Sequence, residues 1–149
     1  MKRSNTNTID YQTASLLKVL GFHENVADHY NRLGLLKRGT PSDGLADYNN
    51  KSLYRFEYSA PTIDGVITWL NEKLLIDIHI KEERPRKDQP LKEHGFRPVV
   101  TVHERGNRER RVVKLSLFSQ YQSASEAAVI YAIRSMHSER FKILPNIIR

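Results

Sequence analysis

A predicted helix that runs directly into a predicted strand, over residues 59–80, constrains the fold of this chain more than any other feature. Pro61 and Thr62 suit the start of a helix, because proline is tolerated before the first turn and threonine accepts hydrogen bonds from the free N–H groups there. Apolar residues then recur at helical spacing over 63–74, and Trp69 is expected in the core with its indole N–H at the rim. From residue 76 the apolar period changes to two, which predicts a half-buried strand up to residue 80.

The preceding segment, residues 1–52, is predicted to be a short helical lead-in followed by a loop. A helix over 9–20 has Thr8 as its cap and Gly21 as its stop signal. Apolar spacing over 26–33 predicts a second short helix. Two short helices around a glycine are typical of the DNA-binding helix-turn-helix, but a leucine occupies the position that this motif keeps small.

The rest of the chain is rich in short strands. Alternating residues predict strands over 53–58, 97–103 and 110–118, the last being the longest, with a hairpin turn over 105–108. Residues 81–96 contain prolines and many charges, and are expected to form an exposed loop.

The chain ends in a predicted helix and an apolar tail. Ser123 and Glu126 form a capping box that opens a helix over 123–137. The tail is split by Pro145, and it is expected to dock on its own domain or on a neighbouring protein. Its apolar residues are Phe141, Ile143, Leu144, Ile147 and Ile148.

This order of elements predicts an α+β fold. The core is expected to be a small, mostly antiparallel sheet of three to four strands with helices packed on one face, in the order α-β-β-β-α. We divide the chain into a lead-in, 1–52, and a core, 53–149, within one compact domain.

Positive charge is concentrated in one part of the chain. The net charge is +7, and residues 81–114 carry 11 basic and 6 acidic residues, a surplus of five. Such a surplus can attract phosphate backbones or an acidic partner. The residues predicted to make these contacts are Arg84, Arg86, Lys87, Arg105, Arg108, Arg110 and Arg111.

Most catalytic and metal-binding signatures are missing from the sequence. The absence of cysteine excludes thiolate zinc sites and a cysteine nucleophile, and the six histidines show no metal-ligand spacing. No glycine-rich phosphate loop is present, so we predict no cofactor. One polar strand face could do acid–base work, with Asp77 and His79 beside Thr101, His103, Lys114 and Ser116.

The order of one helix, three strands and another helix is similar to a double-stranded-RNA-binding domain. That family binds phosphates through a lysine cluster at the start of its last helix, where this chain has Ser125 and Glu126. RNA binding is therefore not carried over with the topology.

A second resemblance covers most of the chain. It is carried by residues 16–22 with 29–31, by Ser-Ala-Pro-Thr at 59–62 with 69–73, and by 121–133. These segments resemble small uncharacterised proteins of prophages and mobile elements of Bacteroidetes. The resemblance implies a setting on a phage-like element and no catalytic residue.

The sequence therefore favours a non-catalytic accessory or interaction protein of such an element over an enzyme. A protein partner or homo-oligomer is expected at the apolar tail. Nucleic-acid binding through the basic residues of 81–114, and a small enzyme using the polar strand face, are the alternatives. No apolar run is long enough for a membrane span, and residues 1–8 lack the apolar region of a signal peptide, so we expect a cytoplasmic location and no membrane partner.

Overall fold

The computed structural model describes residues 8–38, 50–51, 53, 55–84, 94–103 and 110–148, and for 139–148 it describes the backbone. The chain divides into two compact units, residues 1–63 with 133–149 and residues 64–132. Each unit has its own three-stranded antiparallel sheet, so the predicted α+β class is confirmed. The predicted division between residues 52 and 53 stays a prediction.

In the first unit, helix α1 (Tyr11–Val19) begins and ends at residues suited to it. Asp10, and not the predicted Thr8, caps the helix by accepting a hydrogen bond from Thr13 N at 2.7 Å. At the other end Gly21 has a φ of +96°, and its N–H and that of Phe22 donate to carbonyls of the last turn at 3.1 Å each. This is a Schellman motif, which explains why the predicted stop at the glycine is confirmed.

The predicted second helix over 26–33 is wrong, because this segment forms half of a β-hairpin. Strand β1 (Asp28–Tyr30) pairs with β2 (Leu36–Arg38) on one side and β3 (Tyr58–Ser59) on the other. The side chain of Asn31 accepts hydrogen bonds from two backbone N–H groups of the turn between β1 and β2. The apolar spacing of this segment favours a helix, but pairing with strands that include residues distant in the sequence determines its conformation.

The predicted strand over 53–58 is also shorter than expected and belongs to this first sheet. Residues 55–56 form a turn, and only the last predicted residue, Tyr58, is in β3. The buried side chain of Asn50 holds the neighbouring segments, accepting from Ser59 N and donating to the Phe22 carbonyl, both at 2.9 Å.

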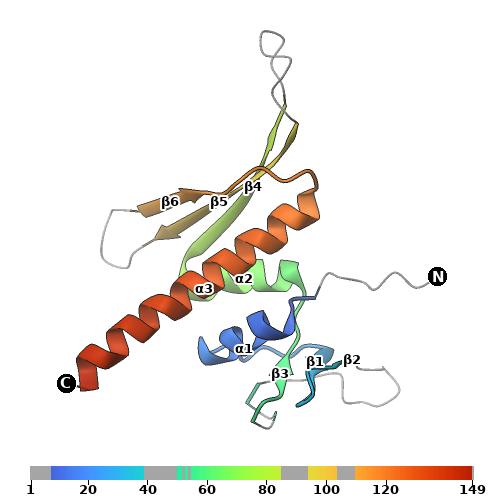
Figure 1. The fold of residues 1–149 in the computed structure, drawn as a ribbon, viewed down its shortest axis with the longest axis vertical. Helices are drawn as coiled ribbons and strands as arrows, with labels where there is room; N and C mark the ends of the chain where they lie inside the picture. Colours follow the sequence, from blue (N-terminus) through green and yellow to red (C-terminus); the bar gives the residue numbers. More distant parts are fainter. Residues whose placement is uncertain are drawn as a thin grey trace. The chain divides into compact units, whose positions relative to one another are not determined.

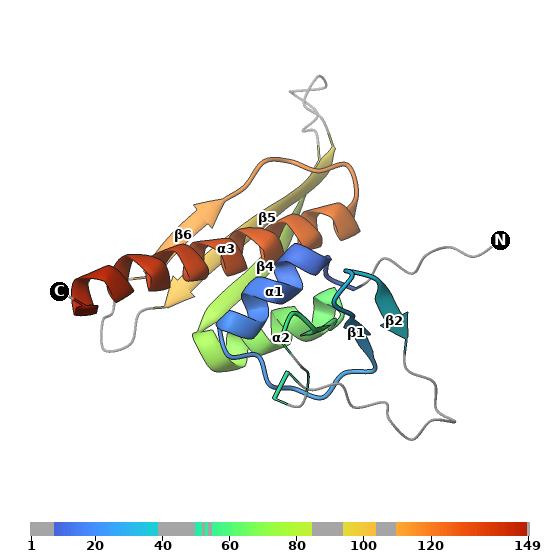
Figure 2. The same cartoon turned by 60° about the horizontal axis from the view of Figure 1, so that its bottom comes forward.

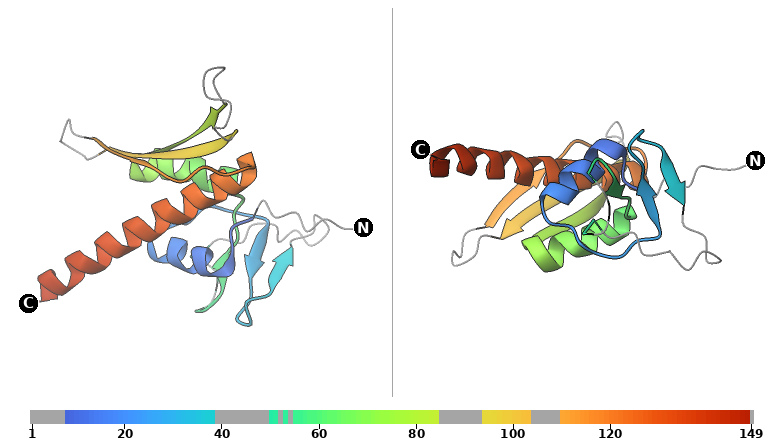
Figure 3. Two further views of the ribbon diagram at one scale, coloured as in Figure 1. Left: turned by 45° about the horizontal axis from the view of Figure 1, so that its top comes forward. Right: turned by 90° about the horizontal axis from the view of Figure 1, so that it is seen from below.

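The second unit contains the predicted α-β-β-β-α core. Helix α2 (Ile63–Leu74) leads into β4 (Ile76–Glu83), which pairs with β5 (Gly95–His103), and β5 pairs with β6 (Arg110–Lys114). Figure 1 shows this order along the chain, and Figure 3 (left) shows α2 and the first part of helix α3 (Tyr121–Ile148) on the same side of the sheet. The predicted helices on one face are therefore confirmed.

The core of this unit lies between the sheet and the two helices. Buried apolar side chains come from both layers, and the predicted burial of the tryptophan is confirmed. They are Val66, Trp69 and Leu70 of α2, Ile76 and Val100 of the sheet, and Ala124, Ala128, Val129 and Ala132 of α3. The α3 residues buried here are mostly small alanines, and Figure 2 shows the first part of α3 on the helix-covered side of the sheet.

Three boundaries in this unit differ from the predictions. Strand β4 continues to residue 83, so the first residues of the predicted loop 81–96 are paired strand. Helix α3 begins two residues before the predicted capping box and continues through Pro145. The hairpin turn 105–108 and the side chains of the apolar tail lie outside the described residues.

The predicted strand over 110–118 is interrupted by a β-bulge. Lys114 pairs with Val99 and Phe118 pairs with Phe96, so residues 115–117 lie opposite the two residues 97–98. A central strand normally excludes proline, and the bulge is where Pro98 is accommodated.

Candidate nucleic-acid interface

The candidate site is the face of the β4–β5–β6 sheet that is turned away from α2 and α3, here called the open face. Side chains alternate along a strand, and the buried Ile76 and Val100 point toward the helices. The cross-strand register then assigns the opposite set to the open face. Its polar members are Asp77, His79, Lys81, Glu83, Arg97, Thr101, His103, Arg110 and Lys114.

Both carboxylates on the open face are already engaged. Asp77 Oδ2 lies 2.8 Å from His103 Nε2, and its other oxygen accepts a hydrogen bond from the Asn71 amide. Glu83 accepts two hydrogen bonds from Arg97, at 2.6 Å from Nε and 3.3 Å from Nη2. The hydrogen bond that Arg97 donates to Glu83 raises the pKa of the Arg97 guanidinium, because it stabilises the charged form.

Arg97 also has a structural task at the bulge. The N–H of Leu115 donates to the Pro98 carbonyl at 2.9 Å, but proline has no N–H to return the bond. Arg97 Nη1 donates to the Leu115 carbonyl instead, at 2.8 Å. The guanidinium of Arg97 is therefore bonded within the protein, to the Glu83 carboxylate and to the Leu115 carbonyl of the bulge, and it is not counted among the cations available to a ligand.

Three permanent cations remain on the open face. Lys81, Arg110 and Lys114 are exposed, and none of them forms an ion pair with another residue in the described part of the chain. His79 is exposed beside them. The face therefore keeps uncompensated positive charge although it also contains two acids.

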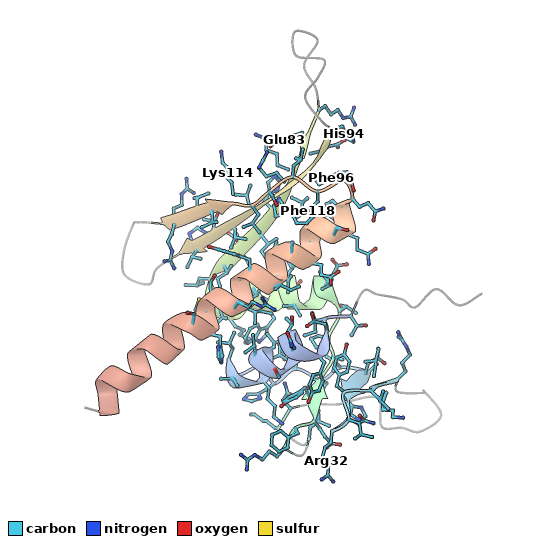
Figure 4. All side chains as sticks on the ribbon, in the orientation of Figure 1. Arg32, Glu83, His94, Phe96, Lys114 and Phe118 are labelled. Carbon is cyan, nitrogen blue, oxygen red and sulfur yellow. The ribbon has the colours of Figure 1, made fainter. Side chains whose placement is uncertain are left out.

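The register places these groups along the sheet. Lys114 lies opposite Val99, which lies opposite His79, and Lys81 is two residues further along β4. Arg110 is four residues from Lys114 on the same strand, about 13 Å away at 3.3 Å per residue. Figure 4 shows Lys114 and Glu83 on this sheet. The cations form an elongated stripe across a face that contains no described Phe, Tyr or Trp in the three strands. Val99, Thr101 and Val112 lie between the charged and histidine side chains of this face.

The predicted contact residues are placed differently from this stripe. Arg110 lies on the open face, whereas the register places its neighbour Arg111 on the opposite face. Arg84 follows the far end of β4 and forms an ion pair with Glu82 at 2.9 Å. Arg84 and Arg110 are separated by the length of β5, roughly 26 Å for eight steps. The other four, Arg86, Lys87, Arg105 and Arg108, lie outside the described residues.

A second charged cluster lies around Glu82, near the C-terminal end of β4. Its Oε1 accepts from Arg84 Nε and lies 3.0 Å from His94 Nε2. These hydrogen bonds, from His94 first and Arg84 second, lower the pKa of the Glu82 carboxyl. The His94 ring meets Phe96 edge-on at 5.7 Å, and Figure 4 shows both near the end of the sheet. Because its charges are satisfied by one another, this cluster adds little to the stripe.

The predicted acid–base constellation is present in part. Asp77 and His103 are hydrogen-bonded, and Thr101 is the cross-strand partner of Asp77, as the alternation predicted. His79 is one row away, opposite Val99. The Asp77 and His103 side chains are 48% and 41% exposed, so water competes for the pair and weakens the electrostatics on which acid–base catalysis depends.

Lys81, Lys114 and His79 are not among the predicted contact residues, because charge counting favoured the loops. The sequence places His79 and Lys114 on the polar strand face only as part of an acid–base constellation. Period-two alternation over 76–83 was the signal that could have found Lys81 and His79, since it places both on one face.

The described residues contain no group of three or more His, Cys, Asp or Glu that could hold a metal ion. Within the same residues, no helix is both long and apolar enough to cross a membrane. No family model, curated protein or solved structure matches this chain.

Proposed function

We propose that this protein is a non-catalytic accessory protein that binds the phosphate backbone of nucleic acid through the open face of its β4–β5–β6 sheet. The observation that carries the proposal is the state of the charges on that face. Glu83 is paired with Arg97, so Lys81, Arg110 and Lys114 stand against the single remaining carboxylate of Asp77 on this face. The resulting surplus of two positive charges can attract a polyanion.

The composition of the stripe favours backbone contacts over base recognition. Single-strand binders stack bases on aromatic side chains, whereas Val99, Thr101 and Val112 separate the cations here. Lysine and arginine side chains are long enough to reach successive phosphates from a flat sheet. We therefore expect binding without strong sequence preference.

The proposed setting is a phage-like or mobile element, in the cytoplasm, where nucleic acid is the abundant polyanion. The resemblance at 59–62 and 69–73 supports this setting. Ser59, Ala60 and Trp69 of these segments are buried, and buried residues support the fold. The resemblance therefore suggests a shared fold and not a shared binding site. The alternative of a protein partner at the apolar tail stays a prediction, because those side chains lie outside the described residues.

Fluorescence anisotropy with labelled duplex DNA, single-stranded DNA and duplex RNA tests the proposal. Three phosphate contacts predict a slope of log affinity against log salt of about −2.7 for duplex DNA, which is about a 40-fold loss between roughly 50 and 200 mM salt. A triple variant with Lys81→Gln, Arg110→Gln and Lys114→Gln is expected to lose both the affinity and most of the slope.

The matched control removes the same charge elsewhere. Lys37, Lys73 and Arg134 are exposed and lie on β2, α2 and α3, and their replacement by Gln changes the net charge equally. Retained binding in this control, with loss in the open-face variant, supports the site. Equal loss in both variants, or no binding to any of the three nucleic acids, contradicts the proposal.

A further inference from the structure

The first unit has an exposed tip where two turns of the chain meet. Tyr30 of β1 pairs with Leu36 of β2 and with Tyr58 of β3, so the turn 31–35 and the turn 55–56 lie at the same end of the sheet. Arg32 marks this end in Figure 4. We call Arg32, Leu33, Leu35, Arg55 and Phe56 the sheet tip.

Large apolar side chains are exposed at the sheet tip. Leu33 is 82% exposed, and Leu35 and Phe56 are each 53% exposed. Single exposed leucines are common on protein surfaces, but here three large apolar residues are exposed at the same end of one small sheet.

Phe56 is held in an unfavourable backbone conformation. Its φ is +68°, in the left-handed region that costs a residue with a Cβ about 1–2 kcal/mol. An exposed ring gains little from burial within this unit, so folding alone does not explain a phenylalanine at this position. Backbone strain of this kind concentrates at ligand-binding sites.

The hairpin turn presents its leucines on a rigid frame. Asn31 Oδ1 accepts hydrogen bonds from Leu33 N at 2.9 Å and from Leu35 N at 3.0 Å. The backbone N–H of Asn31 donates to the Leu35 carbonyl, and the N–H of Gly34 donates to the Asn31 carbonyl. Gly34 has a φ of +78°, which allows the chain to reverse direction in this turn. Such a preformed turn loses little conformational entropy on binding.

The charge of the sheet tip is positive. Arg32 and Arg55 are exposed, and the Arg55 guanidinium lies 5.1 Å from the centre of the Phe56 ring. Burial lowers the pKa of Lys18, and the adjacent carboxylate of Glu57 opposes this lowering by a smaller electrostatic effect. Two arginines around exposed apolar groups complement a ligand that carries carboxylates and apolar side chains together.

From these observations we propose that the sheet tip docks an acidic segment of a partner protein, with apolar side chains that contact Leu33, Leu35 and Phe56. The tip has one aromatic ring, Phe56, on which a base could stack, but its two leucines pack against protein side chains and stack no bases. We therefore favour a protein partner over a nucleic acid. This surface is separate in the chain from the open face, and the proposal does not depend on nucleic-acid binding.

The test begins with selection of a displayed random peptide library on the full chain. We expect enrichment of sequences that combine Asp or Glu with Leu, Ile or Phe. A synthetic peptide of the enriched sequence is then titrated by anisotropy against the chain and against a double variant, Leu33→Ser with Phe56→Asn. Asparagine adopts the left-handed conformation readily, so we expect this variant to keep its fold, which its circular dichroism spectrum checks, and to lose affinity about tenfold or more.

The control is Val19→Ser, which removes an exposed apolar residue of α1 in the same unit and is expected to bind like the unchanged chain. A charge exchange provides a second measurement that does not depend on the apolar variant. Arg55→Glu is expected to weaken the acidic peptide and to bind a version with Lys in place of its acids.

Several outcomes would overturn the proposal. They are no enrichment of acidic and apolar sequences, equal binding by the double variant, and failure of the charge exchange. Loss of oligonucleotide binding in the double variant would assign the tip to nucleic acid instead and would also overturn it.

Discussion

The guanidinium of Arg97 donates to the carbonyl oxygen of Leu115 at 2.8 Å, at the one point of the β5–β6 ladder where Pro98 has no N–H to donate. A side chain thus completes a backbone ladder. Glu83 of β4 accepts from the same guanidinium, so one arginine of β5 links β4 with the residue that directly follows β6.

Replacing Arg97 by Met is therefore expected to destabilise the second unit. The change leaves the Leu115 carbonyl without its donor and Glu83 without its ion pair. Urea unfolding should show a lower midpoint for Arg97→Met than for Lys81→Met, which removes a cation of the same face that pairs with no described residue. Equal midpoints would show that Arg97 does not support the bulge.

Gly95 is expected to tolerate no side chain. A Cβ there would lie 2.6 Å from Leu117 Cγ and 2.7 Å from the Phe118 carbonyl oxygen, and backbone of the bulge cannot move away freely. Gly95→Ala should lower the free energy of unfolding by about 1–3 kcal/mol, as overpacking does.

Gly21→Ala provides the comparison for this effect. A Cβ at Gly21 meets nothing within 4 Å, so its cost is conformational only, about 1–2 kcal/mol for a φ of +96°. If both variants unfolded like the unchanged chain, the bulge packing and the Schellman motif would both be assigned wrongly.

Asn50 should be sensitive to truncation. Its buried amide satisfies the Ser59 N–H and the Phe22 carbonyl together. Asn50→Ala is expected to lower the free energy of unfolding by about 2 kcal/mol, because two backbone groups lose their partner. The exposed Glu24, two residues from Phe22, serves as the control, and its change to Ala should stay within about 0.5 kcal/mol.

The stability of the first unit should fall as the pH is lowered. Burial lowers the pKa of His29, against smaller raising effects of Glu57 and Asp28 and a lowering effect of Lys37. The folded form therefore resists protonation, so its stability is full above the unfolded pKa of about 6.5 and declines below it. Urea unfolding between about pH 7.5 and 5 should show this decline, and His29→Gln should flatten it. An unaltered profile for His29→Gln would contradict the assignment.

Much of the fold follows from local patterns. The change of period near residue 75 predicts the junction of α2 and β4, because spacing of apolar residues encodes which face is buried. Alternation likewise predicts β5, and it places Asp77 beside Thr101. Gly21 predicts the end of α1, since only glycine enters the left-handed region without cost.

Only the tertiary structure decided the features that depend on partners distant in the sequence. Residues 26–33 have helical spacing, yet β1 pairs with β3 some thirty residues later, and this pairing determines their conformation. The same is true of the open face. A count of charges cannot show that Glu83 is paired with Arg97 while Lys81 and Lys114 have no described ion-pair partner, because cross-strand register sets which charges meet. The sequence alone determined the class of fold and its buried faces, which are local properties, whereas long-range pairing determined where the free charge and the exposed tip lie.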